Sequence, residues 1–190
     1  MTDPYELPSG VLRNRLGLRE QDELHSAEAD IAMARLVPLR ANDIPGDYDL
    51  KHLQAFHRFI FGPVYDWAGE LRTVDISKGE VFCRCLHLES FAAEIFGNLH
   101  RRDRLQGLDR SAFIQGLADF YADLNALHPF REGNGRTQRA FIQQLARSAG
   151  HSLSWSGLDA DENEAASIAS FRGEQGPLIA LLDKHLSRDR

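Results

Sequence analysis

Apolar residues recur at steps of three and four along most of the chain, which is typical of helices with one buried face. The clearest case lies between residues 111 and 127, where the apolar positions are Phe113, Leu117, Phe120, Tyr121 and Leu124. Asp109 or Ser111 can cap the start of this helix. His128 ends it, because the residue before a proline is pushed out of helical geometry.

A second strong pattern predicts a helix over about residues 135–149, with Gly150 as its C-cap. Shorter runs of the same periodicity predict further helices at about 20–37, 50–62, 89–101 and 177–187. Most of the chain is therefore predicted to be helical.

One stretch alternates with the period of a strand instead. From Leu71 to Ser77 the polar residues Thr73 and Asp75 lie opposite Val74 and Ile76. The next three residues, 78–80, supply a turn, and residues 81–85 can form a returning strand. A hairpin alone is marginal in water unless it packs on something. We therefore predict a mostly α fold, a helical bundle that carries a small two-stranded flap at about 71–86.

The length of 190 residues fits a single domain covering 1–190. The formal net charge of −6 argues against a direct, broad electrostatic contact with nucleic acid. No apolar run reaches the roughly 20 residues of a membrane helix, and the N-terminus lacks the order of a secretory signal. These features favour a cytoplasmic protein without a membrane segment.

The two cysteines, Cys83 and Cys85, are too close together to cross-link distant parts of the fold, so reduced thiols are expected. Together with His87 they alternate like part of a zinc site. A structural zinc usually needs four ligands, and the sequence offers no adjacent fourth one. We interpret the cysteines as packing residues.

Between the two strongest helices lies the segment His-Pro-Phe-Arg-Glu-Gly-Asn-Gly-Arg-Thr-Gln-Arg, residues 128–139. Gly133 and Gly135 let the backbone approach a ligand closely, and the start of a helix attracts anions. Arg136 and Arg139 are three residues apart, so both guanidinium groups can project towards the same end of that helix. Together these features predict a phosphate cradle.

Glu132 fits such a positive pocket if a cation accompanies it, because Mg²⁺ on a nucleotide is commonly held by one carboxylate and phosphate oxygens. His128 can titrate near neutral pH. The alternative is plain turn chemistry with solvated arginines. A turn, however, does not require His, Glu and two Arg around the same glycines, and an arginine at a helix N-terminus is unfavourable unless an anion is present. We therefore favour a site for phosphoryl-type transfer.

The same twelve residues resemble the motif of the Fic (filamentation induced by cAMP) family, His-x-Phe-x-(Asp/Glu)-Gly-Asn-Gly-Arg-x-x-Arg, with every fixed position filled. Residues 65–72 and the hairpin after them are similar to that family's entry to its flap. The resemblance covers a core of about residues 50–187. It implies transfer of AMP from ATP to a Tyr, Thr or Ser hydroxyl of a target protein, with release of pyrophosphate.

By this resemblance, His128 is the general base that takes the proton of the target hydroxyl. Phe130 anchors the loop, and Glu132 holds Mg²⁺ against the α- and β-phosphates. Three residues form the anion hole, in which Asn134 contacts a phosphate oxygen: Gly133, Asn134 and Gly135. The β- and γ-phosphates are assigned to Arg136 and Arg139.

The resemblance also implies that the flap docks an extended segment of the target by strand addition. The docking residues are then Thr73, Val74, Asp75, Ile76, Ser77 and Lys78. The target itself is suggested only by analogy, since relatives of the small bacterial toxin type modify topoisomerase subunits such as gyrase.

Many Fic enzymes carry a self-inhibiting pattern, (Ser/Thr)-x-x-x-Glu-(Gly/Asn). The nearest match here runs from Ser170 to Glu174 and fails at Gln175, so we interpret it as chance. The resemblance then implies a small antitoxin that supplies an inhibitory Glu in trans.

Two other functions remain as alternatives. The first is Fic-type transfer of another nucleotide or of a phosphate group. Relatives that act as kinases depart from glycine at the place of Gly135, which this chain keeps. The second is a catalytically idle peptide-binding module, which would need neither His128 nor Glu132.

Overall fold

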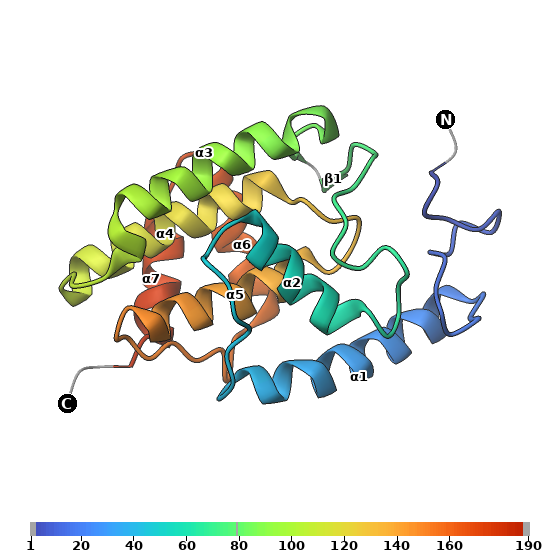
Figure 1. Ribbon diagram of the computed structural model, residues 1–190, viewed down its shortest axis with the longest axis horizontal. Helices are drawn as coiled ribbons and strands as arrows, with labels where there is room; N and C mark the ends of the chain where they lie inside the picture. The colour runs from blue at the N-terminus through green and yellow to red at the C-terminus, as the bar shows by residue number, and fades with distance from the viewer. Residues whose placement is uncertain (1–2, 79, 188–190) are drawn as a thin grey trace.

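The computed structural model describes residues 3–78 and 80–187, and of Lys78 and Glu80 it describes the backbone alone. Gly79, in the predicted turn, lies outside the described residues. Figure 1 shows a bundle of helices with one small hairpin at its edge. The helices are α1 (Gln21–Leu39), α2 (Leu50–Phe61), α3 (Leu88–Arg101), α4 (Arg110–Leu127), α5 (Asn134–Ser148), α6 (Ala160–Phe171) and α7 (Gly176–His185).

The prediction of a mostly α fold is confirmed. Within residues 3–78 and 80–187, no helix combines the length and the apolar character that crossing a bilayer requires.

Helices α4 and α5 carry the site between them, and both were predicted from their apolar periodicity. The carboxylate of Asp109 caps α4 by accepting the N–H of Ala112 at 2.9 Å. His128 ends α4 in a left-handed conformation, φ 44° and ψ 61°, which confirms the predicted helix end. Phe141 of α5 is fully buried in the core that the two helices share.

Helix α6 was not predicted. It packs on α4 and α7, but Ala166 and Ser170 are its only residues with a buried classification among those described, so it has no apolar stripe. Its start nevertheless carries a sequence signal, because Asp159 caps the first turn by accepting the N–H of Glu162 at 2.9 Å. A search for caps as well as for periodicity would have found this helix.

The predicted hairpin is much shorter than expected. Its strands are β1 (Ser77–Lys78) and β2 (Glu80–Val81), paired antiparallel with Ser77 opposite Val81. The prediction of a strand from residue 71 is wrong, because Arg72 is buried and its guanidinium binds main-chain carbonyls. The backbone therefore curves around this side chain instead of forming a ladder.

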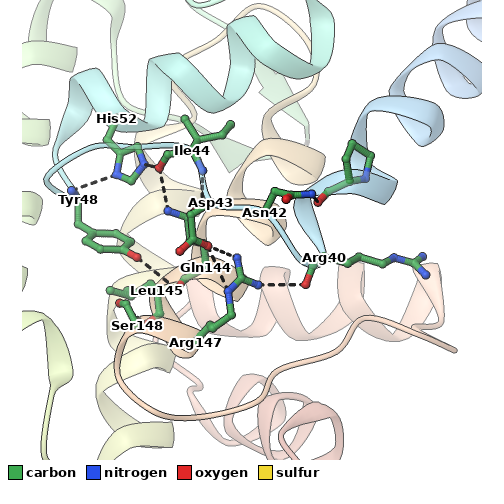
Figure 2. Close-up of polar contacts among 11 residues, drawn as sticks. Arg40, Asn42, Asp43, Ile44, Tyr48, His52, Gln144, Leu145, Arg147 and Ser148 are labelled. Carbon is green, nitrogen blue, oxygen red and sulfur yellow. Dashed lines mark hydrogen bonds and ion pairs between the residues drawn. The ribbon is translucent and has the colours of Figure 1, made fainter.

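The connection between α1 and α2 is tied down to α5 (Figure 2). The side-chain amide of Gln144 accepts the N–H of Ile44 and donates to its carbonyl, both at 2.9 Å. His52 accepts the N–H of Tyr48 at 3.1 Å and donates to the same Ile44 carbonyl at 2.7 Å. With α1 packed on α2 and α5, residues 21–50 are fastened to the core that holds the site.

Candidate active site

A cavity of about 360 Å³ opens where the loop between α4 and α5, the hairpin and α6 meet. Several predicted site residues line it together: His128, Glu132, Asn134, Gly135 and Arg139, with Ile76 and Ser77 from the flap. The unpredicted helix α6 supplies a further wall, made of Asn163, Glu164, Ser167, Ile168 and Phe171. The cavity thus combines residues that are far apart in the sequence.

The imidazole of His128 is held in a defined orientation. Its Nδ1 lies 3.2 Å from the carbonyl oxygen of Asn125. A proton donated from Nδ1 to that carbonyl leaves Nε2 as the basic nitrogen. The ring of Phe82, which follows β2, stacks on the imidazole with 3.8 Å between centroids and 13° between planes. The flap therefore contacts the predicted base directly.

Arg72 fastens the flap to the loop that carries His128, a role the sequence reasoning missed. Its Nε donates to the carbonyl of His128 at 2.9 Å, and its Nη1 donates to the carbonyl of Val74 at 2.7 Å. Its Nη2 donates to the carbonyl of Cys83. Burial lowers the pKa of the Arg72 guanidinium, and the charge of Asp75 opposes that shift. One buried cation thus satisfies three carbonyls around the base.

Phe130 points inward, as predicted, and is fully buried. The amide of Asn134 closes the loop around it, accepting the N–H of Phe130 at 2.9 Å and donating to its carbonyl at 2.7 Å. Both polar atoms of the Asn134 side chain thus bind the backbone of Phe130, and its predicted contact with a phosphate oxygen stays a prediction. Its polar atoms are used to fix the loop, and Asn134 reaches the cavity at the start of α5.

His57 is a second support of this loop. Its ring stacks on Phe130 with 3.9 Å between centroids. Its Nδ1 accepts the N–H of Gly69 at 2.8 Å, so Nε2 carries the proton that is donated to the carbonyl of Glu132 at 2.9 Å. Burial lowers the pKa of His57 to about 4, which keeps the ring neutral. His57 thus lies buried beside the site, with both ring nitrogens hydrogen-bonded to the backbone.

Two glycines at the start of α5 lie where packing inside the chain is close. Gly133 has φ 78°, and a Cβ added there would lie 2.4 Å from the ring of Phe61. A Cβ on Gly135 would lie 3.2 Å from Nη1 of Arg139. Gly133 therefore permits the turn into α5, and Gly135 leaves room for the arginine that faces the cavity.

The two motif arginines separate, contrary to the expectation that both point to the same end. Arg139 lines the cavity and interacts with the hydroxyl of Tyr121. Arg136 instead pairs with the buried carboxylate of Glu28 on α1 and lies 4.7 Å above the ring of Phe61. It is absent from the cavity lining formed by the described residues. Glu28 lies on α1, outside the predicted core of residues 50–187, and its pairing with Arg136 keeps that arginine out of the cavity.

Glu132 keeps a partly exposed carboxylate at the cavity, with 43% of its side chain accessible. Its Oε1 accepts the N–H of Gly133 at 2.8 Å and lies 3.6 Å from Nη2 of Arg136. Over the described ranges, no three side chains of His, Cys, Asp or Glu gather to hold a metal, so the zinc pattern of Cys83, Cys85 and His87 forms no such cluster. A single carboxylate beside an anion site does suit a magnesium ion that a nucleotide brings with it.

The six predicted docking residues of the flap are used unequally. The N–H and hydroxyl of Thr73 contact the hydroxyl of Tyr5, at 3.0 and 3.3 Å, so this N–H is not available to a target strand. Asp75 accepts the N–H of Cys85 at 2.7 Å, and the carbonyl of Val74 accepts from Arg72. Ile76 and Ser77 face the cavity, and Lys78 belongs to β1.

A histidine base, a carboxylate, an arginine and the N-terminus of a helix converge on one cavity, which defines the class of nucleotide-dependent phosphoryl-type transfer sites. The family model that matches residues 47–146 is described as Fic/DOC family. It covers more than half of the chain, and the chain belongs to this family.

Similar proteins agree with this assignment. The chain is 42% identical over 187 residues to the protein adenylyltransferase VbhT of Bartonella schoenbuchensis, covering 97% of this chain but only 39% of that protein. It is 38% identical over 181 residues to an Escherichia coli K12 protein named "Probable protein adenylyltransferase Fic", covering 94% and 88%. The N-terminal Fic domain of a VirB-translocated Bep effector protein with bound ADP, from Bartonella quintana, superposes with a TM-score of 0.91 at 25% identity, covering 98% and 95%.

Proposed function

We propose that this chain is a protein adenylyltransferase, which moves AMP from ATP to a Tyr, Thr or Ser hydroxyl of a target protein. The single observation that supports it best is the placement of His128 and Arg139 on one cavity, at the start of α5. The named activity of the relatives supports the same reaction.

In the proposed reaction, Nε2 of His128 takes the proton of the target hydroxyl. The hydroxyl oxygen forms a bond to the α-phosphorus of ATP, and the bond from that phosphorus to the α,β-bridging oxygen breaks. AMP stays on the target, and pyrophosphate leaves. The contact of Nδ1 with Asn125 and the stack on Phe82 hold the base in place throughout.

The phosphates lie, in this proposal, against the N-terminus of α5, where the first N–H groups have no partner within the helix. Arg139 contributes a forked donor to the β- and γ-phosphates. Glu132 would hold Mg²⁺, which supplies charge neutralisation on the phosphates when bound. The remaining work, orientation of base and nucleotide, belongs to the chain's own side chains.

The target would approach past the hairpin. Ile76 and Ser77 border the cavity next to His128, so a target segment beside them would place its hydroxyl near the base. Lys78 belongs to the same proposed docking surface, because it follows Ser77 in β1. A topoisomerase subunit such as gyrase remains the target suggested by analogy.

We also propose that an inhibitor acts in trans, as a small antitoxin that supplies a Glu to Arg139. In support, Glu174 is exposed in the turn after α6 and is not among the described residues that line the cavity with Arg139. Purified protein that is active without any partner agrees with this proposal. Strong self-inhibition that Glu174→Gly relieves would contradict it.

The proposed activity is tested with ATP labelled on the α- or the γ-phosphate, in the presence of Mg²⁺ and bacterial lysate. AMP transfer predicts a target labelled from the α-position only, whereas phosphate transfer predicts label from the γ-position. His128→Ala should lower the rate about 10²–10⁴-fold. Label that the substitution leaves unchanged would refute the assigned base, and no label in either case would favour an idle binding module.

A further inference from the structure

Glu28, in the middle of α1, is a buried charged group outside the motif. Only 4% of this residue is exposed, and a buried carboxylate is unfavourable unless both oxygens are partnered. Its Oε1 accepts from Arg136 and its Oε2 accepts from the hydroxyl of Tyr65. Burial and the bond to Glu28 raise the pKa of Tyr65, so its hydroxyl stays a donor.

Arg136 stands between two carboxylates. It pairs with Glu28 on one side, and on the other its Nη2 lies 3.6 Å from Oε1 of Glu132. Its guanidinium also lies 4.7 Å above the ring of Phe61, and this cation–π contact helps to hold it in place. Any change that loosens Arg136 from Glu28 therefore acts on Glu132, its nearest other carboxylate.

A guanidinium and a divalent cation compete for the same carboxylate oxygens. If Arg136 were not neutralised by Glu28, its charge would bind Glu132 and would also repel a cation placed there. With Glu28 present, the pair of Glu28 and Arg136 is neutral as a unit. Glu132 then keeps its own charge for the nucleotide-bound metal.

We propose that Glu28 is a positioning residue of the active site, which limits the contact of Arg136 with Glu132 to 3.6 Å and so preserves the affinity of Glu132 for Mg²⁺. This inference rests on the proposed function. It makes α1 part of the catalytic unit, although α1 lies outside residues 47–146, where the family model matches. Glu28 acts through Arg136 and touches no reacting atom.

The test measures binding of α,β-methylene-ATP, which cannot be cleaved at the bond that the reaction breaks, by calorimetry at increasing Mg²⁺ concentration. Glu28→Gln keeps the side-chain size and removes the charge. We expect it to raise the Mg²⁺ concentration for half-maximal binding about 10- to 100-fold, the usual effect of losing a residue that supports a metal ligand. The matched control is Glu23→Gln, an exposed residue of the same helix, which should leave the Mg²⁺ dependence unchanged.

The outcomes separate this inference from the proposed function. If the wild-type protein does not bind the analogue at all, the proposed function fails and the inference fails with it. If the wild type binds and folded Glu28→Gln shows the wild-type Mg²⁺ dependence, only the inference is overturned, even if the melting temperature falls. If Glu28→Gln does not fold, Tyr65→Phe decides, because it removes only one bond to Glu28: a raised Mg²⁺ requirement supports the inference, and an unchanged one overturns it.

Discussion

Two connections in this molecule are fastened by the same kinds of side chain, but only one of them carries residues of the proposed active site. The first is the loop between α4 and α5, which holds His128 and Glu132. The second is the connection between α1 and α2, residues 40–49. Each is fixed by a buried histidine of α2: Nδ1 accepts a main-chain N–H, and Nε2 donates to a main-chain carbonyl. His57 serves the first connection and His52 the second.

Each of the two connections is also held by a side-chain amide. Asn134 accepts from and donates to the backbone of Phe130, and Gln144 does the same to Ile44. Both amides come from α5. The two connections therefore share a means of attachment that satisfies buried backbone groups.

The arginines mark the difference. Arg72 is fully buried; it binds three main-chain carbonyls, one of which belongs to His128, and lies 3.8 Å from the carboxylate of Asp75. Arg147 is 35% exposed and pairs with Asp43, which is 61% exposed. Similar fasteners thus hold a catalytic loop in one place and a scaffold connection in the other. We therefore expect a substitution among the side chains that hold the loop between α4 and α5 to change both activity and stability. A substitution among those that hold the connection between α1 and α2 should change stability alone.

The largest expected effect is that of Arg72→Met. The substitution leaves three partly buried carbonyls without a donor, at about 1–3 kcal/mol each, so we expect a loss of about 4–6 kcal/mol in the free energy of unfolding. Because His128 shifts with its backbone, AMP transfer per folded molecule should fall about 10²-fold. Urea unfolding and labelled-ATP assays measure both. Normal transfer by the folded variant would show that Arg72 supports the fold only.

The comparison is sharpened by changing the two histidines in the same way. His57→Phe keeps a ring but leaves two backbone groups unpaired, the N–H of Gly69 and the carbonyl of Glu132, so it should lower the free energy of unfolding by about 4 kcal/mol. His52→Phe leaves only the N–H of Tyr48 unpaired, because the carbonyl of Ile44 still accepts from Gln144, so it should cost about 2 kcal/mol. Only His57→Phe should also lower AMP transfer, by about tenfold, because its partner is the carbonyl of Glu132. Equal transfer rates for the two folded variants would erase the distinction between the connections.

Acid should weaken the protein through the same histidines. The pKa of His57 is about 4 in the folded protein, below the 6.5 of an ordinary histidine, because the ring is buried; the unfolded chain therefore binds the proton more readily. Its contribution is therefore complete above pH 6.5 and is lost as the pH falls towards 4, by about 3 kcal/mol. Burial lowers the pKa of His52 too, which acts in the same direction. Urea midpoints at pH 7 and pH 4 measure the loss, and His57→Phe should reduce it; an unchanged difference would refute a neutral, buried His57.

The sequence predicted the features that depend on residues close together in the chain, and it missed those that depend on distant residues. The ends of α4, the inward Phe130 and the cavity residues of 128–139 depend on local spacing, which the sequence displays directly. The pairing of Glu28 with Arg136 joins residues 108 positions apart, and no local pattern announces it. The expectation that both motif arginines face the same way failed for that reason.

The flap shows the same limit. Exposure does alternate from Thr73 to Ser77, as the pattern indicated. Yet alternation cannot reveal that the neighbouring Arg72 is buried, because arginines are rarely buried unless paired. Its three carbonyl partners are assembled only when the flap meets the loop after α4. Periodicity thus found which side of the segment faces inward, and packing decided that the segment is not a strand.

The smallest expected effect tests the scaffold side of the comparison. Arg147→Met removes an exposed ion pair, and such pairs contribute about 0–1 kcal/mol because water and salt screen them. Gln144 and His52 still hold Ile44 by direct hydrogen bonds, so the connection should stay in place. We expect urea unfolding to change by less than about 1 kcal/mol, with AMP transfer unchanged. A clear fall in AMP transfer by a variant of normal stability would mean that the connection between α1 and α2 affects the site. The two connections would then no longer differ in their effect on activity.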